Sequence, residues 1–212
     1  NLNTTFYNGG FEVIDTFATS SWLRTLLLHE TAHLYQLNTK DTISSFVRDI
    51  FGSNVVSLVP VPISFSPISF FPVPIVTNPN FFLPNWMIEG NAVLNESRFG
   101  IGGRLYSGEI RAFVYAMARA NLFNATRVTN VYAEFPYGRN SYLSGGYAWA
   151  YISEKYGTKQ ANRIYKKHAD HYFNPFLIDG DVKYLYGKKY KDLLNDIGKY
   201  YKEIAKSQKQ FA

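Results

Sequence analysis

The 212-residue sequence contains no cysteine, and this absence removes several kinds of site at once. Without cysteine the chain cannot form disulfides, thiolate metal ligands or a cysteine nucleophile, and its redox compartment stays undecided. It also lacks a run of eighteen apolar residues, so we expect no membrane-spanning helix. The length suits one domain over residues 1–212 with a substantial core.

Histidine is scarce, with four in the chain, whereas tyrosine and phenylalanine number 17 each. The formal net charge is +6, and every lysine except Lys40 lies at or beyond Lys155. No arginine and aromatic module typical of nucleic-acid binding accompanies these lysines. We therefore interpret them as solvated helix faces and expect no nucleic-acid partner. The chain starts without methionine, and we expect Asn1 to be a processed or cloned boundary.

Two of the four histidines lie in His-Glu-x-x-His, within an apolar stretch preceded by the N-cap candidates Thr19, Ser20 and Ser21. His29 and His33 are about one helical turn apart, so both imidazoles face the same side of a helix. From there they can bind one Zn²⁺ at ~2.0–2.1 Å. Glu30 follows the first ligand directly and is placed to take a proton from water at the metal. The pattern predicts one zinc ion per chain.

A tetrahedral zinc site needs a third protein ligand. One known arrangement uses a third histidine six residues after the second, but Thr39 occupies that position. The other uses a glutamate from a later helix, and Glu89 in Trp-Met-Ile-Glu-Gly-Asn-Ala fits it. Glu96 lies two turns further on the same face and could accept the free N–H of a ligating histidine. Asp41 and Asp49 remain alternative ligands.

Residues 59–84 form an unusual Pro-rich, nearly uncharged insertion between the second and third ligands. Proline at this density excludes a helix interior or a central strand, which predicts an extended, polyproline-like loop. So apolar a loop must pack on the domain, on a partner or on a lipid surface, and it is a candidate contact surface. Before the zinc motif, alternation over Phe6 to Phe17 predicts an edge strand.

The remaining pattern is mainly helical. We predict a helix over Asp41 to Phe51 and one over Trp86 to Glu96, where Gly90 permits a close approach to the backbone of the His-Glu-x-x-His helix. Further helices are expected over Glu109 to Asn121, capped by Ser107, and over Tyr142 to Tyr156, ended by Gly157. Two more are expected over about Lys159 to Ala169 and over Gly187 to Lys206. His168 and His171 are expected on a surface helix end.

Together the two zinc motifs resemble the gluzincin metallopeptidases, and in particular the bacterial peptidase MA-like domains often followed by a TolB-type β-propeller. The likeness covers about residues 20 to 200, with no propeller after it. Weaker matches are Phe51-Gly52, Gly103-Arg104, Tyr142-x-x-Gly145 and the late Tyr186-Gly187-Lys188. One departure is the interval from His33 to Glu89, which the Pro-rich insertion makes longer than in thermolysin-type and aminopeptidase N-type relatives.

The resemblance implies a mainly α (α+β), thermolysin-like catalytic domain: a helical bundle with a small N-terminal edge strand or sheet. It implies a peptide or protein substrate and an extracytoplasmic location. It also implies Tyr142 as the donor to the oxyanion, although serine replaces the lysine of the family's Tyr-x-Lys-Gly motif, and Tyr137 and Tyr147 are alternatives. A different class of function stays open: a catalytically idle zinc-containing scaffold that uses the Pro-rich loop for docking.

Overall fold

A computed structural model gives the fold, and it describes residues 21–51, 58–62, 70–74, 79–100, 102–130, 132–171 and 174–208. For Phe51 and the two strands only the backbone is described. The predicted strand over Phe6 to Phe17 therefore lies outside the described residues. The described part is mainly helical, as the sequence predicts, and no helix in it is both long and apolar enough to cross a lipid bilayer.

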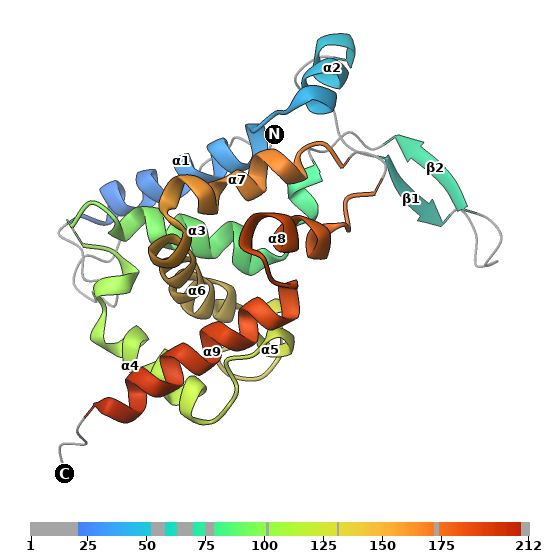
Figure 1. The fold of residues 1–212 in the computed structure, drawn as a ribbon. Coiled ribbons are helices and arrows are strands. Elements are labelled where there is room, and N and C mark those ends of the chain that lie inside the picture. The colour runs from blue at the N-terminus through green and yellow to red at the C-terminus, as the bar shows by residue number, and fades with distance from the viewer. Residues whose placement is uncertain are drawn as a thin grey trace.

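Nine α-helices run through this part of the chain (Figure 1). They are α1 (Trp22–Asn38), α2 (Thr42–Phe51), α3 (Asn85–Ser97), α4 (Gly108–Arg119), α5 (Ala125–Thr129), α6 (Asn140–Tyr156), α7 (Thr158–His168), α8 (Ile178–Tyr186) and α9 (Tyr190–Ser207). Short 3₁₀ turns, η1 (Pro79–Phe82), η2 (Arg104–Tyr106) and η3 (Tyr137–Arg139), precede α3, α4 and α6. The short helices α5 and α8 were not among the predicted elements.

Several helices begin at a capping serine or end at a glycine that can be recognised in the sequence. Ser21 has an extended backbone and its hydroxyl accepts a hydrogen bond from the Arg24 amide, which caps α1. Ser107 caps α4 in the same way. Gly157 separates α6 from α7 at a φ of 81°, a left-handed value that favours glycine.

The Pro-rich segment differs from the predicted unpaired loop. Two short strands, β1 (Leu58–Pro62) and β2 (Phe70–Pro74), pair antiparallel, with Pro60 opposite Pro72. Each strand in a two-stranded sheet has one unpaired edge, and proline is tolerated there because it needs no ladder hydrogen bond. The exclusion of a helix and of a central strand is consistent with this hairpin.

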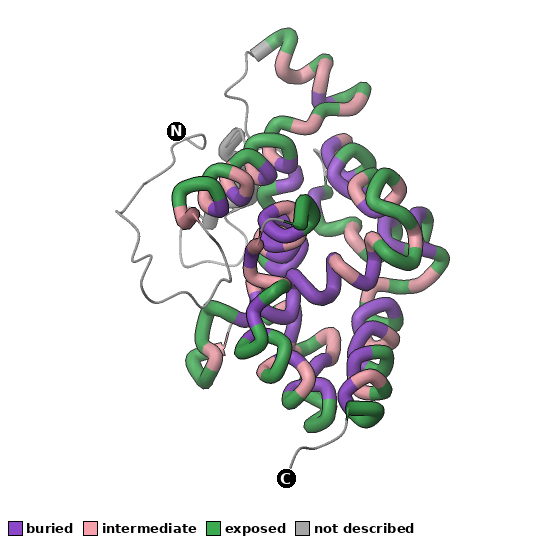
Figure 2. The backbone as a smooth tube through the Cα atoms, turned by 90° about the vertical axis from the view of Figure 1, so that its left-hand side faces the viewer, coloured by how far each residue is buried: buried purple, intermediate pink, exposed green. Residues whose placement is uncertain are grey.

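The core is centred on α3 and α6, which lie between α1 and α7 on one side and α4, α5 and α9 on the other (Figure 1). Trp86 of α3 and Trp149 of α6 are fully buried, and Trp149 stacks on Tyr165 of α7. The buried positions concentrate on these inner helices (Figure 2). Two helices that carry candidate site residues, α3 and α6, are therefore also the most firmly held.

Helix α1 packs on α3 with an unexpected face. Its buried positions are Thr25, His29, Ala32 and Gln36, which follow the helical period but are mostly polar. Three of its leucines are exposed: Leu23, Leu27 and Leu34. Trp22 and Leu26 are only partly buried. The buried face of α1 therefore carries mainly polar side chains, which have partners on α3.

Candidate metal centre

The packing of α1 on α3 brings His29, His33 and Glu89 together. Nε2 of His29 lies 3.1 Å from Oε2 of Glu89, and Nε2 of His33 lies 3.4 Å from the same oxygen. The three ligand atoms all lie within 4.8 Å of one another. Ligands at ~2.0–2.1 Å from a tetrahedral zinc ion are ~3.3 Å apart, so these separations fit a shared ion.

The other nitrogen of each imidazole has its own acceptor. Nδ1 of His29 lies 2.6 Å from Oε1 of Glu96, and Nδ1 of His33 lies 2.9 Å from Oε1 of Gln36. These acceptors favour the tautomers with a proton on Nδ1, which leave a lone pair on each Nε2. Two nitrogen lone pairs and a carboxylate oxygen then face one another, and this arrangement suits a cation.

The environment of Glu89 stabilises the ionised form of its side chain. Burial raises the pKa of Glu89, but hydrogen bonds from His29 and His33 outweigh this effect and lower it to about 2. For His29, burial lowers the pKa and hydrogen bonds to Glu89 and Glu96 raise it, with a net increase. Glu89 is therefore a carboxylate at neutral pH, as a metal ligand must be.

Glu96 is itself held in place by Arg104. The side chain of Glu96 is fully buried, and its Oε1 accepts a hydrogen bond from Nη1 of Arg104 at 2.5 Å. Oε2 of Glu96 accepts from the Arg104 backbone amide at 3.4 Å. A buried carboxylate needs such compensation. Glu96 can thus orient the ring of His29, as predicted from its position two turns after Glu89.

Gln36 performs the corresponding task for His33. Its side chain is completely buried, and its Nε2 donates to the Ile88 carbonyl at 3.0 Å and to Oδ1 of Asn91 at 3.1 Å. These bonds fix which end of the amide faces His33. The sequence assigns no such role to Gln36 or Arg104, although Gln36 is three residues after His33 and could therefore have been recognised as its helical neighbour.

Tyr142 also faces the cluster. Its ring stacks on His29 with centroids 6.0 Å apart, and the Arg104 guanidinium lies 5.2 Å from its ring centre. Burial, followed by the neighbouring charge of Glu89, raises the pKa of Tyr142 to about 12. The charge of Glu30, which is partly buried next to His29, acts in the same direction. Tyr142 therefore keeps its proton at neutral pH and can donate it in a hydrogen bond.

The alternative residues lie elsewhere. Asp41 pairs with Lys166 at 3.6 Å and Asp49 is exposed, and neither belongs to the ligand cluster. Tyr137 is 61% exposed, whereas Tyr147 is buried against Tyr115 and Tyr201. Among the candidates named from the sequence, the structure brings His29, His33, Glu89, Glu96 and Tyr142 together.

The prediction for His168 is wrong. His168 is completely buried, and its Nδ1 lies 2.9 Å from Oδ2 of Asp181. His171 is partly buried, with Nε2 at 2.9 Å from both oxygens of Asp181. From the sequence, His168 and His171 are expected on a surface helix end. The last turn of α7 in fact turns His168 toward α8, which the sequence did not predict as a helix.

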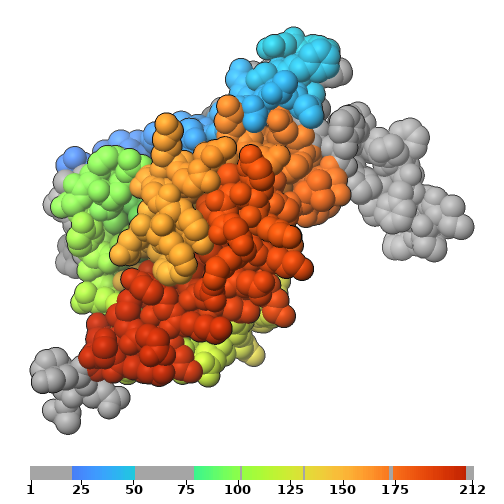
Figure 3. Space-filling model, in the orientation of Figure 1, coloured from blue at the N-terminus to red at the C-terminus, as the bar shows by residue number. Residues whose placement is uncertain are grey.

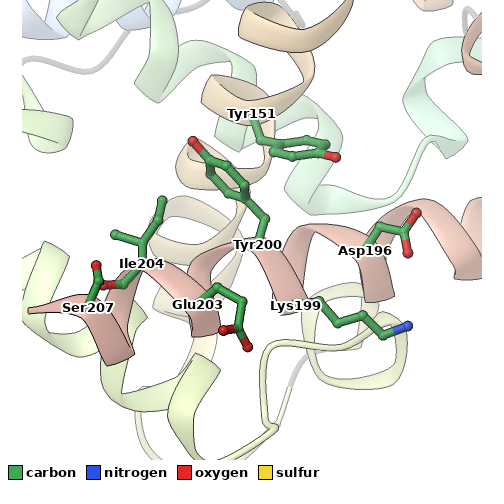
Figure 4. A pocket seen from close by; sticks show the side chains of 7 residues that line it. All are labelled: Tyr151, Asp196, Lys199, Tyr200, Glu203, Ile204 and Ser207. Carbon is green, nitrogen blue, oxygen red and sulfur yellow. The ribbon is translucent and has the colours of Figure 1, made fainter.

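A surface depression on α9 is separate from this centre. It has a volume of about 560 Å³ and contains none of the candidate ligands (Figure 4). Its lining side chains come from α6 and α9 and are Tyr151, Asp196, Lys199, Tyr200, Glu203, Ile204 and Ser207. Charges of both signs line it, so its composition favours no particular ligand.

No protein-family model, no curated protein and no solved structure matches this chain significantly.

Proposed function

We propose that this chain is a zinc-dependent metallopeptidase of the gluzincin type. The observation that carries the proposal is the convergence of three electron-pair donors, Nε2 of His29, Nε2 of His33 and Oε2 of Glu89, with Glu30 next to the first. Few chemistries other than metal binding explain two histidines whose Nδ1 atoms face outer acceptors while their Nε2 atoms face a carboxylate. The His-Glu-x-x-His spacing then selects peptide hydrolysis.

In this proposal His29, His33 and Glu89 hold Zn²⁺. Bound zinc supplies a Lewis acid that acidifies water to a pKa of about 7 and polarises a carbonyl group. Glu30 takes the proton of the attacking water and passes it to the nitrogen of the leaving amine. The Tyr142 hydroxyl donates a hydrogen bond to the oxygen that becomes negative during attack. Glu96 and Gln36 keep both imidazole rings oriented.

The test is cleavage of casein or a quenched fluorescent peptide by zinc-loaded protein. We expect activity that a chelator abolishes and that zinc restores. Glu30→Gln keeps the shape of the side chain and leaves the metal ligands intact, but removes the base. It should lower activity at least ~10²-fold, the lower end of general-base contributions, with zinc content unchanged. Full activity in Glu30→Gln would remove Glu30 from the mechanism.

The same experiment distinguishes the idle scaffold. A chain that binds zinc but shows no hydrolysis with casein or with a broad peptide library would support a docking role instead. The position of Tyr142 against His29 favours the peptidase, because an idle zinc site needs no donor for an oxyanion.

A further inference from the structure

The chain's other two histidines form a second cluster, again with one carboxylate. His168 ends α7, His171 lies just beyond it, and Asp181 lies in the first turn of α8. Their ligand atoms also lie within 4.8 Å of one another. All four histidines of the chain thus occur as two pairs, each facing one carboxylate.

A local turn brings the two rings together. The His171 amide donates to the His168 carbonyl at 3.0 Å, so the chain folds back as α7 ends. The rings then meet edge to face with centroids 5.3 Å apart. Nδ1 of His168 and Nε2 of His171 both lie 2.9 Å from Oδ2 of Asp181. These atoms need to separate by only a few tenths of an ångström to reach the ~3.3 Å spacing of ligands around a tetrahedral zinc ion.

Asp181 is a buried carboxylate whose ion-pair partners are two histidines. Only 3% of its side chain is exposed, and in the part of the chain that the structure describes its ion pairs are with His168 and His171, not with lysine or arginine. Neutral imidazoles offer it hydrogen bonds but no positive charge. The N-terminus of α8 offsets part of the burial cost. A divalent ion among the three side chains would supply the missing charge.

We propose that His168, His171 and Asp181 form a second metal site for a divalent first-row transition ion such as Zn²⁺, bound through Nδ1, Nε2 and the carboxylate. Two imidazoles and one carboxylate are a common ligand set for such ions. The side chain of His171 is 19% exposed, which gives the ion an entry path.

The site lies where it can support the first one. Asp170, between the two histidines, accepts hydrogen bonds from the Ile43 and Ser44 amides at the start of α2. Figure 3 shows α2, in cyan, against the orange end of α7. On the same helix, the Tyr165 hydroxyl lies 3.4 Å from Nε2 of Gln36, the side chain that orients His33. An ion at the end of α7 would therefore stabilise both α2 and the surroundings of the first centre.

The proposal is tested by zinc stoichiometry of the full chain. Protein stripped with a chelator is dialysed against Zn²⁺, and bound metal is measured by mass spectrometry and calorimetric titration. We expect two zinc ions per chain for the wild type and one for His171→Gln or Asp181→Asn. Asp179→Asn is the matched control, because Asp179 lies in the same turn of α8 but accepts from the Tyr190 amide instead. It should keep both ions.

Equal stoichiometry in the wild type, His171→Gln and Asp181→Asn would overturn the proposal and leave a hydrogen-bonded His-Asp-His contact. His171→Gln decides the matter if Asp181→Asn fails to fold, because His171 is partly exposed. A second experiment measures the melting temperature of Glu89→Ala with and without zinc. In this variant the first cluster has lost a ligand and only the second cluster stays intact. Zinc should raise its melting temperature, and should not do so in Glu89→Ala/His171→Gln.

The result is independent of the proposed peptidase centre. If the first centre binds no zinc, the wild type holds one ion, which His171→Gln loses and Glu89→Ala keeps. If the second site is wrong, the pattern reverses: the single ion is lost in Glu89→Ala and kept in His171→Gln. Peptidase activity enters neither comparison.

Discussion

Gly90 of α3 lies directly against Gly145 of α6, backbone to backbone. A Cβ atom on Gly90 would lie 2.3 Å from the carbonyl carbon of Gly145, and one on Gly145 would lie 2.8 Å from the Trp86 carbonyl oxygen. Because α3 carries Glu89 and α6 carries Tyr142, this contact fixes the distance between a ligand and the proposed oxyanion donor. From the sequence, Gly90 was expected to bring α3 close to the helix with the two histidines; the structure shows that Gly90 instead lies against α6.

Gly90→Ala should therefore be strongly destabilising. The added methyl group meets backbone atoms that cannot rotate away, so α3 and α6 must separate. Overpacking of a core costs ~1–3 kcal/mol, and a backbone contact belongs at or above the upper end. Urea denaturation measures the change in the free energy of unfolding. Gly180→Ala in α8 is the control: its added methyl group meets nothing within 4 Å, and it should stabilise by ~0.4–1 kcal/mol. Equal effects of both variants would contradict the close contact.

Features that depend on local geometry could be predicted from the sequence, whereas features that depend on contacts between helices could not. The spacing of His29 and His33, the start of α3 near Glu89 and the caps Ser21 and Ser107 follow from local geometry, and the structure has them as predicted. What the sequence did not reveal depends on which elements meet. The polar inner face of α1 is one example, because Gln36 is buried by its partners on α3 rather than by apolarity.

The burial of His168 also depends on a contact between helices. Its neighbours Lys166 and Lys167 indicate a solvated helix end, and they are indeed exposed. Helix α7 has a buried face as well, however, and His168 belongs to it through Asp181 of α8. A short helix such as α8 gives a weak periodic pattern, so its aspartate could not be placed from sequence.

Glu89 is expected to bind the metal of the first centre. Glu89→Gln removes the charge and keeps the shape, so the chain should fold normally but lose the zinc ion held by His29 and His33. Asp41→Asn and Asp49→Asn are matched controls, because both aspartates lie outside the cluster and should leave zinc binding unchanged. Metal analysis after dialysis checks this. Retained zinc in Glu89→Gln with loss in either control would assign the third ligand to that aspartate.

Gln36 should act on zinc affinity through His33. Gln36→Leu removes the acceptor of the His33 Nδ1–H, and loss of such an outer partner typically lowers metal affinity ~10–100-fold. Gln36→Glu keeps an acceptor for His33 and loses the donors to Ile88 and Asn91, so it should retain more affinity while still losing stability. Competition with a zinc chelator measures the affinities. Equal affinity losses would mean that Gln36 contributes packing alone and does not orient His33.

Tyr142 is expected to stabilise the oxyanion. The phenol would donate a hydrogen bond to negative charge that develops only in the transition state. Removing that hydrogen bond should therefore lower kcat with little change in KM. Tyr142 meets the requirement of proximity, because its ring stacks on His29, and the requirement of protonation, because burial and the charge of Glu89 raise its pKa to about 12. Losing one such donor typically costs ~10²–10³ in rate.

Tyr142→Phe keeps the ring against His29 and under Arg104, so zinc content and melting temperature should barely change. Peptide-cleavage kinetics should show kcat reduced ~10²–10³-fold. Tyr137→Phe is the control, because Tyr137 is 61% exposed and should stay within a few-fold of wild type. If KM rises and kcat does not fall, Tyr142 contacts the substrate before reaction rather than the oxyanion. If Tyr137→Phe loses activity and Tyr142→Phe does not, the donor comes from the turn before α6, five residues before Tyr142.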